Sequence, residues 1–137
     1  MKVVYIAHPI AGDLTDNLNR IIEIVKQINL TKPDIVPLAP YFVDCIALDD
    51  ENPAHRNRGI KNGEELLRRR FVDELWLYGD RISPGMWSEI KLCRDLGIRV
   101  VPQTINTHWI YFKNIELSRV MGNIKKTAES FKSILKN

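Results

Sequence analysis

A serine, a glycine and a glutamate in residues 83–89 are spaced so that a carboxylate would lie beside an anion-binding position. Ser83 and Pro84 favour a helix start, because serine caps the first turn and proline suits the first helical position. Gly85 lies four residues before Glu89, so Glu89 leans over a position that has no side chain. The free N–H groups of the first turn, together with the Ser83 hydroxyl, would bind an anion such as phosphate. The alternative is that Ser83 and Pro84 only cap the helix and that Glu89 is only a solvated side chain.

The residues before this segment predict the element that positions it. Leu75–Tyr78 is an apolar run typical of a buried strand, and Gly79-Asp80 predicts a turn at its end. A parallel strand that ends at a polar loop and leads into a helix N-terminus is where α/β proteins bind ligands. We therefore take residues 72–90 as the candidate site.

The first 37 residues have the pattern of a strand, a helix and a second strand. Residues 3–7 are continuously apolar and end at the turn His8–Gly12, which contains proline and glycine. Apolar residues then recur at helical spacing from Leu14 to Ile28. Residues 34–37 predict the second strand, which completes a βαβ unit.

Strand and helix patterns continue to alternate along the rest of the chain. We expect helices at about 56–71 and 84–96, and strands at 74–78 and 98–101. Residues 38–55 predict a short helix and an exposed loop that acts as a flap over the site. Residues 104–112 predict an edge strand, followed by an amphipathic helix that Gly122 weakens.

This alternation predicts an α/β fold with a doubly wound parallel sheet of about five strands. Residues 1–103 would form the α/β domain, and residues 104–137 an extension packed on it. Ligands bind such sheets at the carboxyl ends of the strands, where the strand order reverses. The loop at residues 8–12 is therefore expected beside the loop at residues 80–85.

The composition is that of an ordinary globular domain, with 45% apolar and 27% charged residues among 137. No apolar run approaches the length of a membrane span, and no signal peptide pattern is present. Cys45 and Cys93 lie far apart, and His55 and His108 lack partners at metal-ligand spacing. We expect a cytoplasmic protein without a metal ion. The sequence contains no phosphate-binding or dinucleotide-binding glycine motif, so neither an ATPase nor a dinucleotide-binding reading is supported.

Positive charge is concentrated at the end of the chain. Residues 104–137 hold five lysines and one arginine against two glutamates, a surplus of four positive charges. A solvated helix face explains this surplus more simply than a nucleic-acid partner, which we do not expect.

Two stretches resemble the nucleoside 2-deoxyribosyltransferase-like superfamily. Residues 5–12, YIAHPIAG, resemble its YIAGPI-x-G opening. Residues 72–90, VDELWLYGDRISPGMWSEI, are similar to the signature of one branch of uncharacterised proteins, the DUF4406 type. The resemblance covers about residues 2–101 and implies a flavodoxin-like fold.

The resemblance also implies roles for three catalytic residues. Glu89 matches the carboxylate that attacks C1′ of a deoxyribonucleoside or its monophosphate, forming a glycosyl-enzyme. Tyr5 matches a tyrosine that holds this nucleophile. Glu65 matches an aspartate that protonates the leaving base or orients the sugar. No cofactor is implied.

The same resemblance predicts the substrate and the residues that bind it. Relatives that act on nucleosides carry aspartate where Ser83 stands, whereas nucleotide N-glycosidases carry serine, so a 5′-monophosphate is favoured. His8 replaces a glycine and would either contact the ligand or crowd the site. Asp80 would either bind ribose hydroxyls or hold the turn. The expected substrate-binding residues are Ser83, Gly85, Met86, His8, Pro9, Gly12, Asp80 and Arg56.

Two further expectations follow. The rival to catalysis is a non-catalytic nucleotide-binding protein, a sensor or a sequestering protein, on the same fold. Since the relatives build their sites at dimer contacts, we expect a homodimer or a higher homo-oligomer.

Overall fold

The computed structural model describes residues 1–136, which form a four-stranded parallel sheet with five helices. The strands are β1 (Lys2–Ala7), β2 (Ile35–Leu38), β3 (Glu74–Leu77) and β4 (Arg99–Pro102). Their order across the sheet is β2-β1-β3-β4. Tyr5 on the central strand β1 is in register with Leu38 of β2 and Leu75 of β3.

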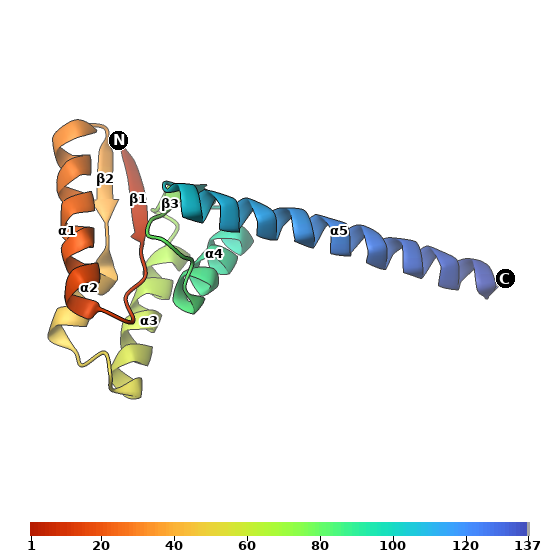
Figure 1. Ribbon diagram of the computed structural model, residues 1–137, viewed down its shortest axis with the longest axis horizontal. Helices are drawn as coiled ribbons and strands as arrows, with labels where there is room; N and C mark the ends of the chain where they lie inside the picture. The colour runs from red at the N-terminus through yellow and green to blue at the C-terminus, as the bar shows by residue number, and fades with distance from the viewer. Residues whose placement is uncertain (137) are drawn as a thin grey trace.

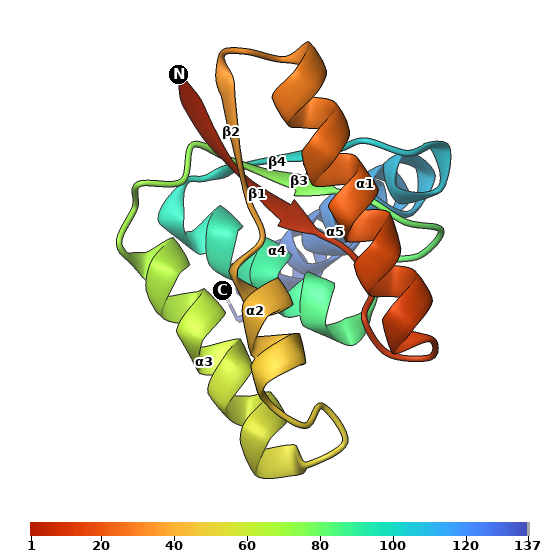
Figure 2. The ribbon, with the colours of Figure 1, turned by 90° about the vertical axis from the view of Figure 1, so that its left-hand side faces the viewer.

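The helices connect the strands and then continue beyond the sheet. They are α1 (Leu14–Thr31), α2 (Pro40–Ala47), α3 (Pro53–Arg68), α4 (Pro84–Leu96) and α5 (Ile105–Leu135). Figures 1 and 2 show α1 on one side of the sheet, with α2, α3 and α4 toward the other. The α2 helix and the loop after it confirm the short helix and exposed loop expected in residues 38–55.

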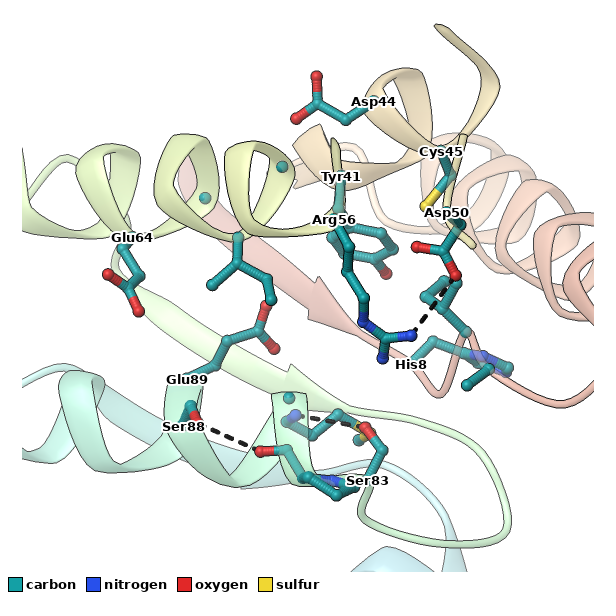
Figure 3. A pocket seen from close by; sticks show the side chains of 18 of the residues that line it. His8, Tyr41, Asp44, Cys45, Asp50, Arg56, Glu64, Ser83, Ser88 and Glu89 are labelled. Carbon is teal, nitrogen blue, oxygen red and sulfur yellow. Dashed lines mark hydrogen bonds and ion pairs between the residues drawn. The ribbon is translucent and has the colours of Figure 1, made fainter. Parts of the chain in front are cut away.

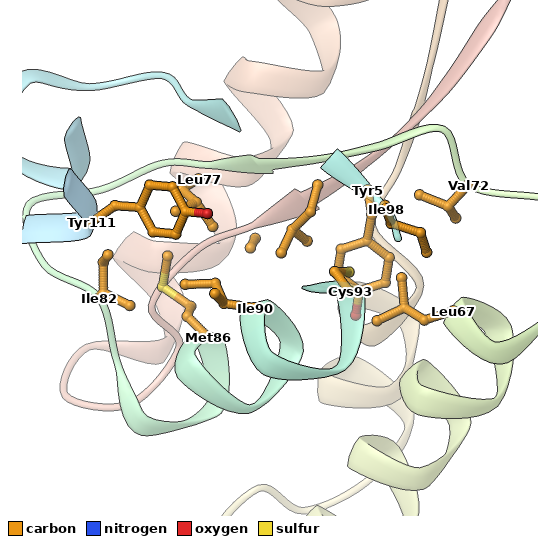
Figure 4. Close-up of a cluster of buried hydrophobic side chains, with 12 residues drawn as sticks. Tyr5, Leu67, Val72, Leu77, Ile82, Met86, Ile90, Cys93, Ile98 and Tyr111 are labelled. Atoms are coloured by element: carbon orange, nitrogen blue, oxygen red, sulfur yellow. The ribbon is translucent and has the colours of Figure 1, made fainter. Parts of the chain in front are cut away.

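Alternate residues of the strands build two hydrophobic layers, one on each face of the sheet. Val4, Ile6 and Trp76 pack with Ile28 of α1. Tyr5, Ala7, Leu75 and Leu77 face the larger layer, which α3, α4 and the start of α5 cover (Figure 4). Both faces of the sheet are thus buried, which explains why β1 and β3 appear as continuous apolar runs.

The strand order reverses between β1 and β3, because the chain passes from β1 outward to β2 and then returns to the other side. The loops that follow β1 and β3 therefore lie side by side. The Arg81 guanidinium donates to the Ala11 carbonyl oxygen over 2.8 Å, which joins them directly. This confirms the predicted flavodoxin-like, doubly wound α/β fold, with four strands rather than about five.

The edge strand expected at residues 104–112 is wrong, because these residues begin α5. Thr104 and Thr107 form a capping box that starts the helix, and Thr107 and Tyr111 are its buried residues. Only the first turns pack on the sheet. All residues from 116 to 136 are exposed, and Figure 1 shows this part of α5 projecting away from the α/β body. Of residues 104–137, which were expected to pack on the domain, only the first turns of the helix do so; residue 137 lies outside the described residues.

Candidate functional site

A cavity of about 240 Å³ opens at the carboxyl ends of β1 and β3. Its walls come from five parts of the chain: β1 and its loop, α2 and its loop, α3, the loop after β3, and α4 (Figure 3). The polar and charged residues that line it are Tyr5, His8, Tyr41, Asp44, Asp50, His55, Arg56, Glu64, Arg81, Ser83, Ser88 and Glu89.

Glu89 and Tyr5 form the centre of this cavity. The Tyr5 hydroxyl donates a hydrogen bond of 2.8 Å to Glu89 Oε1. Tyr5 projects from the middle of the sheet with its ring in the hydrophobic layer, and Glu89 is half-buried on the second turn of α4. Because the ring is fixed by packing, the hydroxyl holds one carboxylate oxygen in place, as sequence resemblance implied for Tyr5.

Burial raises the pKa of Glu89 to about 7. Loss of solvation disfavours the charged carboxylate, and the nearby Glu64 carboxylate raises the pKa further, whereas the Tyr5 hydrogen bond opposes both effects. A carboxyl group with this pKa is partly ionised at neutral pH and is poorly solvated when ionised. These are properties of a nucleophile or of a general acid or base.

Two neighbours fix the tyrosine that holds Glu89. A Cβ atom on Gly63 of α3 would lie 3.0 Å from the Tyr5 hydroxyl, so glycine gives this hydroxyl its room. Tyr41 of α2 lies with its ring centroid 6.0 Å from that of Tyr5, and its own hydroxyl donates to the Ile6 carbonyl oxygen over 2.6 Å. Helices α2 and α3 thus position Tyr5 from the side opposite α4.

The N-terminus of α4 has the features expected from its sequence. Ser83 is the N-cap, and its Oγ accepts from the Met86 N–H over 3.3 Å. Gly85 is exposed on the cavity wall, and a Cβ atom there would have only Ser83 Oγ, 3.9 Å away, within contact range. The first turn of α4 is therefore open to the cavity on the side of Glu89.

Positive side chains lie toward the other end of the cavity. Figure 3 shows Glu64 and Glu89 at one end of the view, with Arg56 directed toward the middle and His8 beyond it. Arg56 lies 3.7 Å from Asp50 in the loop after α2, and both are partly exposed. Arg81 lines the cavity from the loop after β3. A ligand with an electrophilic carbon at one end and an anion at the other would match these charges.

His8 is buried, and its imidazole is uncharged. Its Nδ1 lies 2.7 Å from the Pro9 carbonyl oxygen, an arrangement in which Nδ1–H donates and Nε2 remains an acceptor. Burial lowers its pKa. His8 therefore brings no further positive charge to the cavity wall.

Comparison with known proteins places the chain in a family. Residues 2–103 match the family described as "Domain of unknown function (DUF7768)". The chain belongs to this family. The finer DUF4406-type assignment suggested by residues 72–90 is not supported, since DUF7768 is the family that matches.

Among solved structures, the chain is similar to a 2-desoxiribosyltransferase from Leishmania mexicana, with a TM-score of 0.49 and 20% sequence identity. The similarity covers 74% of this chain and 63% of that protein, so the chain spans less than two thirds of its length. Among curated proteins, no sequence matches the chain.

Most residues predicted for the site of this DUF7768 member line the cavity. These are Tyr5, His8, Arg56, Ser83, Gly85, Met86 and Glu89. Four others do not line it: the expected catalytic residue Glu65, described below, and three expected substrate-binding residues. Pro9 is buried against the Gly79 turn, Gly12 is exposed beside Arg81, and Asp80 is exposed and ion-paired with Arg81 over 3.6 Å.

The second carboxylate of the cavity is Glu64 rather than Glu65. Glu65 is exposed and pairs with Arg69, one turn along the outer face of α3, over 2.8 Å. Helical spacing could have indicated Glu64, because it shares a helix face with Ile60 and Leu67, and Leu67 is fully buried. Arg81 was also missed, since a single loop arginine has no periodicity to indicate its direction.

The described part of the chain shows neither a metal site nor a membrane span. In residues 1–136, no three His, Cys, Asp or Glu side chains gather closely enough to hold a metal ion. None of the helices described there combines the length and apolarity needed to cross a bilayer, although α5 is long enough.

Proposed function

We propose that this protein cleaves the N-glycosidic bond of a (deoxy)nucleoside 5′-monophosphate, as an N-glycosidase or a deoxyribosyltransferase. The observation that carries the proposal is the Glu89 carboxylate, held by Tyr5 over 2.8 Å in a cavity that also contains Glu64 and two arginines. Its pKa of about 7 keeps a substantial fraction ionised at neutral pH. The resemblance of residues 5–12 to the opening motif of the nucleoside 2-deoxyribosyltransferase-like superfamily, and the match of Glu89 to its nucleophile, support the same chemistry.

In the first step, Glu89 Oε attacks C1′ of the sugar while the bond from C1′ to the base nitrogen breaks. The electron pair of that bond leaves with the base, which takes up a proton. Glu64 is the second carboxyl group at this end of the cavity, and we assign the proton exchange with the base to it. The product is a glycosyl ester on Glu89 and a free base.

In the second step, a water molecule or another base attacks C1′ from the face that the first base left. The ester bond breaks, Glu89 returns to a carboxylate, and Glu64, which gave its proton to the first base, takes up the proton that the attacking water or base loses; the configuration at C1′ is retained. Tyr5 stabilises the carboxylate both before attack and after release, since its hydroxyl donates to the same oxygen.

We assign the phosphate to the α4 N-terminus and the arginines. Ser83, Pro84 and Gly85 line the cavity, where the Gly85 N–H and the Ser83 hydroxyl would donate to the phosphate, whereas the Met86 N–H already bonds to Ser83 Oγ. Arg81 and Arg56 line the same cavity and would add charge-assisted hydrogen bonds. A nucleoside without phosphate would lack these contacts and is therefore expected to have a higher KM.

The decisive experiment incubates the protein with each deoxynucleoside 5′-monophosphate and measures released base by chromatography. We expect release from at least one of them, and a fall of at least about 10³-fold in Glu89→Ala. Glu64→Gln should slow release by about 10²-fold. Glu65→Gln is the matched control, because Glu65 has the same chemistry on the neighbouring residue but faces solvent. Absence of release from every nucleotide, or release unchanged in Glu89→Ala, rejects the proposal.

A non-catalytic nucleotide-binding protein is the second candidate, and His8 is the observation that favours it. Its imidazole is 6% exposed and occupies a place in the cavity wall where the related motif has glycine. This candidate predicts that a deoxynucleoside monophosphate raises the melting temperature without any release of base. It also predicts that the shift persists in Glu89→Ala and disappears when Arg81 is replaced by alanine.

A further inference from the structure

The outer two thirds of α5 carry large apolar side chains that nothing in the described residues covers. Leu117, Met121, Ile124, Phe131 and Leu135 are between 57% and 83% exposed. Figure 1 shows the helix leading away from the α/β body, so these side chains have no surface of their own chain to pack against. Solvent exposure of so many large apolar groups along one helix is a mark of an interaction surface.

These residues follow a heptad repeat. Leu117, Met121, Ile124, Ala128, Phe131 and Leu135 are separated alternately by four and three residues. They therefore occupy successive d and a positions of a single seam, which ends toward the body at the a position held by Asn114. Gly122, which lowers helix propensity, falls at an outward b position, where it leaves the seam intact. An apolar repeat with alternating spacings of three and four residues is the pattern of a coiled coil.

The residues that flank the seam favour one orientation of two paired α5 helices. The e positions hold Ser118, Lys125 and Lys132, whereas the g positions hold Val120, Thr127 and Ile134. In a parallel pair, each e residue faces a g residue of the other helix, so each lysine stem lies over an uncharged side chain. In an antiparallel pair, e residues face each other, which brings Lys125 and Lys132 of the two helices together. For two copies of α5, the lysines thus favour a parallel pair over an antiparallel pair.

We propose that residues 117–135 of α5 form a parallel coiled coil with a second copy of this chain. The seam is about 28 Å long, from 19 residues at 1.5 Å each. Because α5 is fixed to the body through Thr107 and Tyr111, parallel pairing sets both α/β bodies at the same end of the coiled coil. The proposal is independent of the chemistry assigned to the cavity, since none of these residues lines it.

Mass measurement of the full chain by light scattering tests the association. The native protein should have twice the monomer mass at micromolar concentration. Ile124→Lys places a charge in the seam and should raise the dissociation constant of the dimer at least ~10-fold. Asn123→Lys is the matched control, because it adds the same charge one residue away at an outward c position. A monomeric native protein, or a dimer that Ile124→Lys leaves unchanged, overturns the proposal.

Disulfide trapping tests the direction of the pair. Leu117→Cys and Phe131→Cys are made singly, with the native protein as the background for Cys45 and Cys93. In a parallel pair, each new cysteine faces its counterpart, and both variants cross-link under mild oxidation. In an antiparallel pair these positions lie about 21 Å apart along the helix, so at most one variant cross-links. Cross-linking of one variant or of neither overturns the parallel arrangement.

Discussion

At the scale of single residues, Glu89 combines reactivity with a cost in stability. Its carboxylate has lost much of its hydration, and Glu64 adds a second negative charge nearby, so the ionised form is disfavoured. The Tyr5 hydrogen bond stabilises the ionised carboxylate and so offsets part of this desolvation and repulsion. A carboxylate that is poorly solvated and singly hydrogen-bonded reacts more readily with an oxocarbenium-like centre than one in water.

The pKa of Glu89 predicts how the proposed reaction depends on pH. The nucleophile must be ionised, so kcat/KM for base release should rise about tenfold per pH unit at pH values below about 7, where Glu89 ionises. Tyr5→Phe removes the hydrogen bond that lowers this pKa, so the midpoint of the profile should move to higher pH. Initial rates across the pH range measure both, and a midpoint near 4.5 in the native protein contradicts the assignment.

The same pKa predicts that Glu89→Gln stabilises the fold while it removes activity. A carboxyl group whose pKa is raised in the folded state ionises first in the unfolded state, so stability falls as pH rises from about 4.5 to 7. Glutamine cannot ionise and avoids this loss. We expect Glu89→Gln to raise the free energy of unfolding by about 1–3 kcal/mol above pH 7 and not at all at pH 4. The gain is at this level because the cavity is open to solvent. Urea unfolding at the two pH values measures the difference.

At the scale of elements, the site depends on how the loop after β1 meets the turn after β3. Gly79 has a φ of +96°, and a Cβ atom there would lie 2.7 Å from Pro9 Cδ. The His8-Pro9 segment therefore packs directly on the backbone of the turn. Pro9, which does not line the cavity, instead sets the position of His8, which does.

This contact predicts a large effect of Gly79→Ala. The left-handed backbone conformation disfavours a side chain, and the methyl group would overlap the proline ring, so unfolding should become easier by about 2–4 kcal/mol. Gly97→Ala is the matched control, because Gly97 has a φ of +75° with nothing within 4 Å of the added Cβ. In Gly97→Ala the free energy of unfolding should fall only through the strained backbone conformation, by about 1–2 kcal/mol. Equal losses in thermal unfolding would show that the contact with Pro9 contributes nothing.

Sequence patterns predicted these elements to different degrees. The apolar runs of β1 and β3 and the serine cap of α4 depend on local rules, and they predicted both the fold and the position of Glu89. Glu65 was placed by resemblance alone, and the helical phase of α3 turns it to solvent and Glu64 inward. The strand expected at residues 104–112 failed because a capping box, Thr104 with Thr107, outweighs the β-branched and aromatic composition that follows.

At the scale of the whole molecule, α5 is attached to the body at one end through hydroxyl groups. Thr104 Oγ1 donates to the Gly79 carbonyl oxygen over 2.8 Å, and Thr107 Oγ1 to the Leu77 carbonyl oxygen over 3.1 Å. Both acceptors belong to the end of β3 and the turn that shapes the site. The same two threonines start the helix and fix it to the sheet, so the direction of the projecting part is set there.

Thr107→Val therefore tests whether this attachment stabilises the molecule as a whole. Thr107 is fully buried, and valine preserves its shape but removes the hydroxyl that bonds to Leu77 and accepts from the Thr104 N–H. Because the half-buried Thr104 N–H and the Leu77 carbonyl oxygen both lose this partner, the free energy of unfolding should fall by about 1–3 kcal/mol. Thr31→Val is the control, since the Thr31 hydroxyl bonds the Gln27 carbonyl oxygen on an exposed helix end and should change stability by less than ~0.5 kcal/mol. Equal urea midpoints for the two variants would mean that apolar packing of Tyr111 alone holds α5 on the sheet.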